Sequence, residues 1–227
     1  MSFLFSALLY ISLLLQGFFL FLLRGSYRRY SFLGLYCFVQ LAMVGIEGFV
    51  FLDSGVNSVL YRNLYWTTDV VLDLLLFLAI ITMTYAVLEG SPLKPAMGKA
   101  LGVVVAAALL LPFALFSNPF SSYWFNHTSQ MLSFGAAIMD LVLWTAILSQ
   151  RKRDSRLLTL SAGLGVAATG VAISYGIEMV WPARWELSNV FMSVTHVASL
   201  VIWCWAFRPS TRDRATGSAP DALPEHS

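Results

Sequence analysis

Charge is what this sequence has least of. Only 11% of the 227 residues are Asp, Glu, Lys or Arg, whereas 58% are hydrophobic. Soluble domains carry about a quarter charged residues, so this composition excludes an ordinary soluble domain. It predicts one all-α membrane domain over residues 1–208, followed by a polar tail over residues 209–227 that is expected to be disordered. The net charge of +2 is small, and no nucleic-acid partner is expected.

Cysteines and catalytic motifs are also scarce. The two cysteines, Cys37 and Cys204, lie singly inside apolar runs, so neither a disulfide framework nor a metal site is predicted. The sequence contains no glycine-rich phosphate loop, no paired-histidine metal motif and no Gly-x-Ser-x-Gly elbow. We therefore expect no enzymatic activity, no metal and no cofactor. The function has to be sought among the polar residues of the apolar segments.

Seven segments are apolar enough to span a bilayer. They are expected at residues 3–23, 31–52, 61–89, 99–116, 127–149, 157–180 and 187–207. Pro112 is expected to kink or end the fourth helix. Three consecutive aromatic residues, at 123–125, are expected in the loop before the fifth helix, at the membrane interface. The sixth segment is rich in Gly and Ser, a pattern that lets helix backbones approach closely.

Lys and Arg are distributed unevenly between the two sides of these spans. Two of the fourteen, Arg62 and Arg184, fall on one side. The other twelve fall on the opposite side: Arg24, Arg28, Arg29, Lys94, Lys99, Arg151, Lys152, Arg153, Arg156, Arg208, Arg212 and Arg214. Cytoplasmic loops carry an excess of such residues, so the N-terminus is predicted outside and the C-terminus in the cytoplasm. We expect a multi-pass protein of the cell membrane, of bacterial inner-membrane type, whose basic loops contact anionic lipid or a protein.

Two aspartates lie inside the third apolar segment. Asp69 and Asp73 are four residues apart, so they share one helix face. With a rise of about 1.5 Å per residue, Asp73 lies roughly 16 Å below Arg62, near the middle of the hydrocarbon layer. Placing a carboxylate at that depth in the membrane costs about 2.5–3.5 kcal/mol, so we expect the two aspartates to have a function or a compensating partner. The alternative is a structural role, in which both acids hydrogen-bond and hold helices together.

Apart from residues at the very ends of the spans, three more acids and one histidine lie inside them: Glu47, Asp140, Glu178 and His196. With five acids and no deep Lys or Arg, the carboxylates cannot all be ionised without partners. They are protonated, pair with Arg62 or Arg184 at the outer mouth, or bind a cation. We predict that these four residues, with Asp69 and Asp73, line an outward-facing acidic cavity that binds a ligand or protons.

Two resemblances bear on the fold. The length, seven spans and outside N-terminus resemble the topology of microbial rhodopsins, in which retinal needs a lysine in the seventh helix. The segment 187–207 has no lysine, so covalently bound retinal is excluded. Arg-Arg-Tyr at 28–30 and Tyr-Trp-x-x-Asp at 65–69 resemble small seven-helix membrane proteins of acidobacterial type. That resemblance implies a membrane location and this topology, but no chemistry.

Three functions are compatible with these patterns. The first is a receptor- or sensor-like module that binds a small cationic ligand or protons in the acidic cavity. The second is a proton-coupled transporter with a relay through Asp73, Asp140 and His196, which the odd span count and lack of repeats disfavour. The third is a structural subunit of a membrane complex. Ligand identity and oligomeric state are left open by the sequence.

Overall fold

The described part of the chain is built from seven α-helices. This computed structural model describes residues 2–26, 30–55, 57–89, 94–150, 154–181, 183 and 185–208. The helices are α1 (Ser2–Leu23), α2 (Ser31–Ser54), α3 (Val59–Val87), α4 (Lys94–Leu115), α5 (Ser122–Leu148), α6 (Ser155–Val180) and α7 (Trp185–Ala206). All seven are long and apolar enough to cross a membrane, which confirms the predicted all-α bundle and indicates a multi-pass membrane protein. Arg184, the basic positions 28–29 and 151–153, and the tail 209–227 lie outside the described residues.

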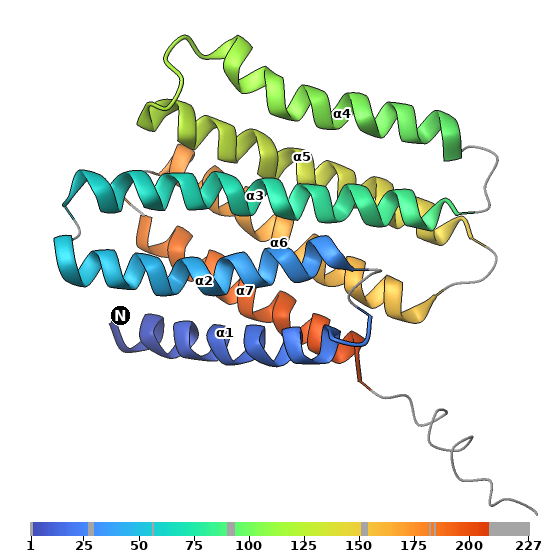
Figure 1. The fold of residues 1–227 in the computed structure, drawn as a ribbon, viewed down its shortest axis with the longest axis horizontal. Coiled ribbons are helices and arrows are strands. Elements are labelled where there is room, and N and C mark those ends of the chain that lie inside the picture. Colours follow the sequence, from blue (N-terminus) through green and yellow to red (C-terminus); the bar gives the residue numbers. More distant parts are fainter. Residues whose placement is uncertain are drawn as a thin grey trace, which may run out of the picture.

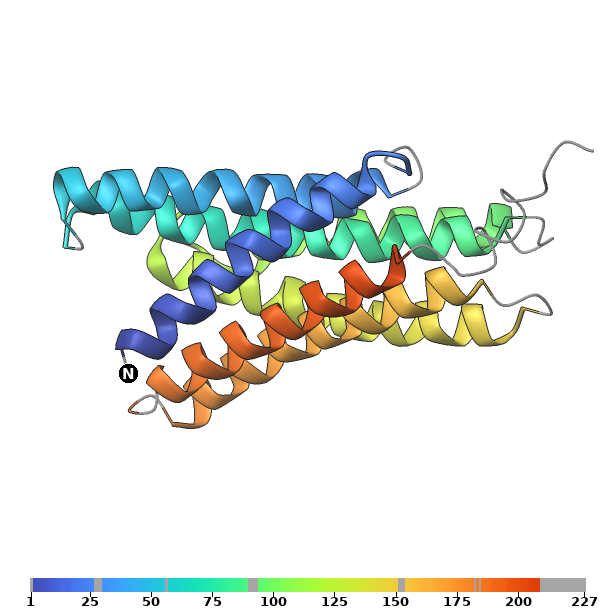
Figure 2. The same cartoon turned by 90° about the horizontal axis from the view of Figure 1, so that it is seen from below.

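Helix α3 occupies the centre of the bundle. It packs against α2, α4, α5 and α6, while α6 packs along α7. Helix α4 lies at one edge, against α3 and α5, and α1 lies at the opposite edge (Figure 1). Helix α1 runs obliquely and contacts both α2 and α7, so it ties two parts of the bundle together (Figure 2). The acids of α3 are therefore placed among neighbouring helices rather than at the periphery.

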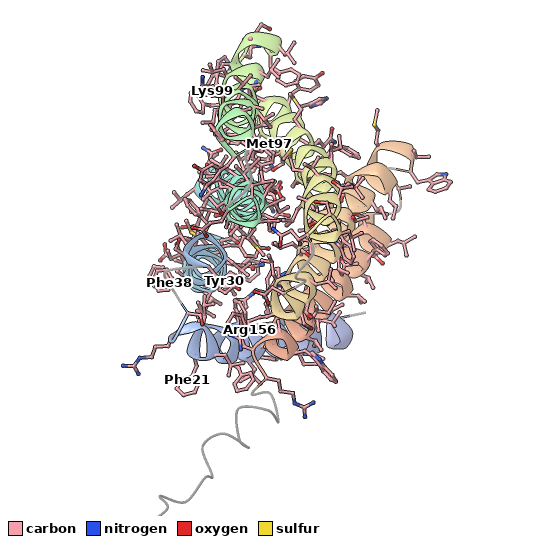
Figure 3. The ribbon with its side chains drawn as sticks, turned by 90° about the vertical axis from the view of Figure 1, so that its right-hand side faces the viewer. Phe21, Tyr30, Phe38, Met97, Lys99 and Arg156 are labelled. Atoms are coloured by element: carbon pink, nitrogen blue, oxygen red, sulfur yellow. The ribbon has the colours of Figure 1, made fainter. Side chains whose placement is uncertain are left out.

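The two ends of the bundle differ in charge. The start of α1 lies at the same end as the α2–α3 and α6–α7 connections, which we call the N-terminal end (Figure 1). Arg62 lies in the first turns of α3, at this end. The opposite, C-terminal end carries Lys99 and Arg156, and Figure 3 views the bundle from this end. The described Lys and Arg residues thus follow the asymmetry seen in the sequence.

An aromatic core fills the C-terminal half of the bundle. Its centre is Trp203, which is fully buried, with ring centroids 5.7 Å from Phe19 and 6.1 Å from Tyr36. The indole Nε1 of Trp203 donates a hydrogen bond to the Leu160 carbonyl at 3.2 Å. A Cβ atom added to Gly163 would lie 2.3 Å from that Nε1, so α6 and α7 approach this closely only because residue 163 is glycine. This confirms the close packing predicted from the small residues of the sixth span.

Apolar side chains cover the outside of the bundle. Leu14 on α1 and Phe49 on α2 are 75% and 71% exposed. Water would not favour so large an apolar surface on a monomer, but hydrocarbon does. The surface composition therefore agrees with the membrane assignment made from the helices.

Two predicted boundaries were wrong. Helix α5 begins at Ser122 rather than 127, because the Ser121 side chain caps it by accepting a hydrogen bond from the Trp124 backbone N–H at 3.2 Å. The aromatic residues at 123–125 therefore lie in the first turn of α5, not in a loop. Helix α4 begins at Lys94 rather than 99, and it ends three residues after the buried Pro112.

Candidate functional site

A polar pocket of about 250 Å³ lies at the N-terminal end of the bundle. It is enclosed by α3, α5, α6 and α7, and we call it the mouth pocket. Its lining consists of Tyr65, Trp66, Asp69, Ser122, Phe125, Asn126, Ser174, Tyr175, Glu178, Ser188, Asn189 and Met192. The two charged residues of this lining, Asp69 and Glu178, are both acidic. The pocket therefore has the electrostatic character of a cation site.

Asp69 is held in place from two other helices. The hydroxyl group of Tyr175 on α6 donates a hydrogen bond to Asp69 Oδ2. The hydroxyl group of Ser129 on α5 donates to the same oxygen at 3.4 Å. These two donors fix the carboxyl group, and because both reach Oδ2 they leave Oδ1 to interact with a ligand.

The rim of the mouth pocket combines a second acid with aromatic rings. Glu178 Oε1 accepts a hydrogen bond of 2.9 Å from the Ser188 hydroxyl group, which links α6 to α7. The ring of Trp66 stacks on Phe125, with centroids 6.2 Å apart and an interplanar angle of 27°. The guanidinium carbon of Arg62 lies 5.3 Å from the Trp66 ring centroid. The structure thus places Arg62 at this end of α3, against an indole ring.

A smaller cavity of about 50 Å³ lies between α2, α3, α6 and α7, and we call it the deep chamber. Its lining consists of Tyr36, Gln40, Asp69, Leu72, Asp73, Leu76, Ala167, Val171, Met192, Thr195 and His196. Asp69 and Met192 line both cavities, so the two meet at these residues. Asp73 lies about 20 Å along the axis of α3 from Val59, which places the chamber near the middle of that helix.

Asp73 is the most deeply buried acid of the two cavities. Only 5% of its surface is exposed. The hydroxyl groups of Ser129 and Ser133 lie beside its carboxyl group. Among the described residues, however, its Oδ2 atom has no hydrogen-bond partner, and neither has the buried Oε1 atom of Gln40. Such oxygens are costly to leave uncompensated, so the chamber needs either a proton on Asp73 or a bound cation.

His196 is tied to the first helix. Its Nε2 atom lies 3.0 Å from the side-chain nitrogen of Gln16 on α1. This contact joins α1 to α7, and the buried Oε1 atom of Gln16 has no partner among the described residues. Gln16 also donates to the Ser12 hydroxyl group at 3.2 Å. Sequence reasoning missed Gln16, although an isolated amide inside an apolar span was a signal that could have identified it.

Two predicted site residues lie outside the linings of both cavities. Glu47 on α2 is half-buried beside Thr68 of α3. Asp140 on α5 is buried against α6, where a Cβ atom added to Gly165 would lie 2.5 Å from its Oδ2 atom. The structure therefore brings together Asp69, Asp73, Glu178 and His196, and it places Glu47 and Asp140 at separate helix contacts.

The described residues contain no group of three or more His, Cys, Asp or Glu side chains that could hold a metal ion. Sequence reasoning also left out Tyr175 and Ser129, because the helices that carry them are far from Asp69 in the sequence. No family model, no curated protein and no solved structure matches this chain. What the fold and the cavities define is a class: a multi-pass helical membrane protein with a polar, acid-lined interior at its N-terminal end.

Proposed function

We propose that this protein is a receptor- or sensor-like seven-helix module that binds a small organic cation, such as a protonated amine, in the mouth pocket. The observation that carries the proposal is the pairing of Asp69 and Glu178 with aromatic walls from Trp66 and Phe125. A carboxylate provides charge-assisted hydrogen bonds to an ammonium group, and aromatic faces attract cations. The alternative within the same site is the binding of protons.

The size of the pocket limits the ligand. Pockets for drug-sized molecules are about 300–1,000 Å³, so one of about 250 Å³ suits an amine of roughly ten heavy atoms. Ser188 and Asn189 at the start of α7 supply neutral polar groups for a second end of the ligand. An amine with one small polar or aromatic substituent is the chemical class that fits best.

The proposal includes an orientation in the membrane. The N-terminal end with its mouth pocket faces the outside of the cell membrane, and the basic C-terminal end faces the cytoplasm. Support comes from the uneven distribution of Lys and Arg, since such residues are enriched in cytoplasmic loops. The basic end then meets anionic lipid or a protein partner, which would receive the signal.

A proton-coupled transporter is less well supported than a receptor. A relay through Asp73, Asp140 and His196 needs the three groups to communicate. Asp73 and His196 line the deep chamber, but Asp140 lies further along α5, packed against Gly165, and lines neither cavity. A structural subunit, whose acids only join helices, is tested by the variants described in the Discussion.

The experiment compares three ligands of nearly equal shape. Benzylamine is cationic, benzyl alcohol is neutral and benzoate is anionic. We expect isothermal titration of the full chain in lipid nanodiscs to show saturable binding of benzylamine alone. Equal binding of benzylamine and benzyl alcohol would mean that the acids do not select charge, and the proposal would fail.

A second assay separates a receptor from a carrier. Proteoliposomes that contain the protein are loaded with a pH-sensitive dye, and benzylamine or a proton gradient is applied. A receptor leaves the internal pH trace identical to that of protein-free liposomes. Protein-dependent proton or amine flux would favour the transporter.

A further inference from the structure

We propose that the deep chamber is a separate binding site for a small monovalent cation of the size of sodium, coordinated by Asp73. This inference rests on the proposed function in one respect, which is that the deep chamber and the mouth pocket belong to the same acidic interior. It depends on Asp73, however, whereas amine binding depends on Asp69 and Glu178. The two proposals can therefore fail independently.

The first argument is the uncompensated charge of the chamber. Only 5% of the surface of Asp73 is exposed to solvent. Its Oδ2 atom lacks a hydrogen-bond partner within the described part of the chain. The Nε2 atom of His196 lies 3.0 Å from the Gln16 side chain on α1, and the described residues contain no ion pair between His196 and Asp73. A carboxyl group buried in this setting carries a proton or has a cation close by, and we infer the cation.

The second argument is the set of oxygen-bearing side chains that line the chamber with Asp73. The chamber is also lined by Gln40, whose buried Oε1 atom has no partner among the described residues. Thr195 donates its hydroxyl proton to the Phe191 carbonyl at 3.0 Å, so the lone pairs of its oxygen remain available as acceptors. Carboxylate, amide and hydroxyl oxygens are the ligands that hard cations prefer.

The third argument is size and charge. The chamber volume of about 50 Å³ is a fifth of that of the mouth pocket, so the chamber suits a small ion with a few waters. Calcium takes six to eight oxygen ligands, several of them carboxylates, and magnesium retains several waters, so neither suits so small a chamber. Two carboxyl groups line the chamber, but Asp69 accepts hydrogen bonds from Tyr175 and Ser129, so Asp73 supplies the one negative charge that a monovalent cation balances. An organic amine of the size taken by the mouth pocket does not fit here.

The test compares alkali ions at equal ionic strength, so that screening is constant. The apparent melting temperature of the full chain in detergent is measured at one scan rate in sodium, potassium or caesium chloride. We expect sodium to raise it by about 3–6 °C relative to caesium, since a ligand that binds only the folded state stabilises it. Equal melting temperatures in all three salts would overturn the inference and favour a proton on Asp73.

Variants locate the ion. Asp73→Asn keeps the shape of the side chain and removes its charge, so the sodium effect should disappear. Glu178→Gln, which changes the mouth pocket alone, should retain it. If Asp73→Asn does not fold, Gln40→Leu is the second variant, and we expect it to reduce the sodium effect at least twofold. A sodium effect of unchanged size in either chamber variant would show that the ion binds elsewhere, and would overturn the assignment.

Benzylamine titration of the same samples keeps the two proposals apart. Sodium stabilisation without benzylamine binding would leave the chamber assignment intact and remove the amine site. Benzylamine binding without any difference between sodium and caesium would leave the amine site intact and remove the sodium site in the chamber.

Discussion

The two ends of this bundle use their buried residues in opposite ways. At the C-terminal end, Trp203 is fully buried, its N–H group is hydrogen-bonded and its ring packs on Gly163 and Phe19. At the N-terminal end, the helices enclose two cavities and leave the Oδ2 atom of Asp73 without a partner in the described structure. The C-terminal end is tightly packed and the N–H group of its buried tryptophan is hydrogen-bonded, whereas the N-terminal end contains cavities and acidic side chains.

This difference has a physical basis. Helices in a membrane gain little from burying apolar surface, because lipid is as apolar as leucine, so tight packing must hold them together. Aromatic rings fitted against glycines provide that packing at the C-terminal end. The energy gained there offsets the cost of keeping acids and cavities at the other end. Variants at the two ends should therefore separate stability from binding.

The largest expected effect is a loss of stability at the C-terminal end. Trp203→Ala removes the centre of the aromatic core, and we expect it to cost about 3–5 kcal/mol of unfolding free energy through the cavity left behind. Trp205→Ala is the matched control, because this neighbouring tryptophan is 64% exposed. Thermal unfolding in detergent is the measurement. Similar losses for the two variants would show that no specialised core exists at this end.

The next effect concerns binding at the N-terminal end. Asp69→Asn should weaken benzylamine binding by at least about 30-fold, since losing one partner of a buried charge pair costs about 2 kcal/mol or more. The folded yield in detergent should stay near that of the unaltered chain. If the yield collapses instead, Asp69 acts mainly to hold α3 against α5 and α6, and the structural-subunit function is favoured.

A smaller effect is expected at the rim of the mouth pocket. Glu178 is half-buried, so its charge is partly screened by solvent. Glu178→Gln keeps the hydrogen bond from Ser188 possible and removes only the charge. We expect benzylamine affinity to fall about 2–5-fold by isothermal titration. A loss as large as that for Asp69→Asn would mean that Glu178, rather than Asp69, is the main counter-ion.

The smallest effect is expected for an acid outside both cavities. Asp140→Asn should leave benzylamine affinity unchanged within about twofold, because distant sites without shared partners act independently. The same variant would abolish flux through a proton relay. The titration and the liposome assay on this one protein thus distinguish the receptor from the transporter.

Much of the fold could be predicted because membrane spans have a strong sequence signal. Continuous apolar runs gave all seven helices, and small residues such as Gly163 indicated close packing of α6. The start of α5 was missed because its aromatic first turn resembles an interfacial loop, and the cap provided by Ser121 is a single hydroxyl group. Helix ends depend on such local contacts, which hydropathy does not reveal.

The part of the site that the sequence predicts most directly is the one whose residues share a helix. Spacing placed Asp69 and Asp73 on one face of α3, and both line the cavities. Which helices surround that face depends on tertiary packing, so depth alone assigned Asp140 to the same cavity as Asp73. The donors Tyr175 and Ser129 reach Asp69 across helix contacts that no sequence periodicity encodes.

The most direct test of the account observes the carboxyl group itself. Protein labelled with ¹³C at the aspartate side-chain carboxyl carbons is titrated with benzylamine in nanodiscs, and the resonances are assigned from Asp69→Asn and Asp140→Asn. The account predicts that the Asp69 resonance shifts and saturates while that of Asp140 stays in place. A saturable shift at Asp140 with none at Asp69 would contradict a cation site in the mouth pocket.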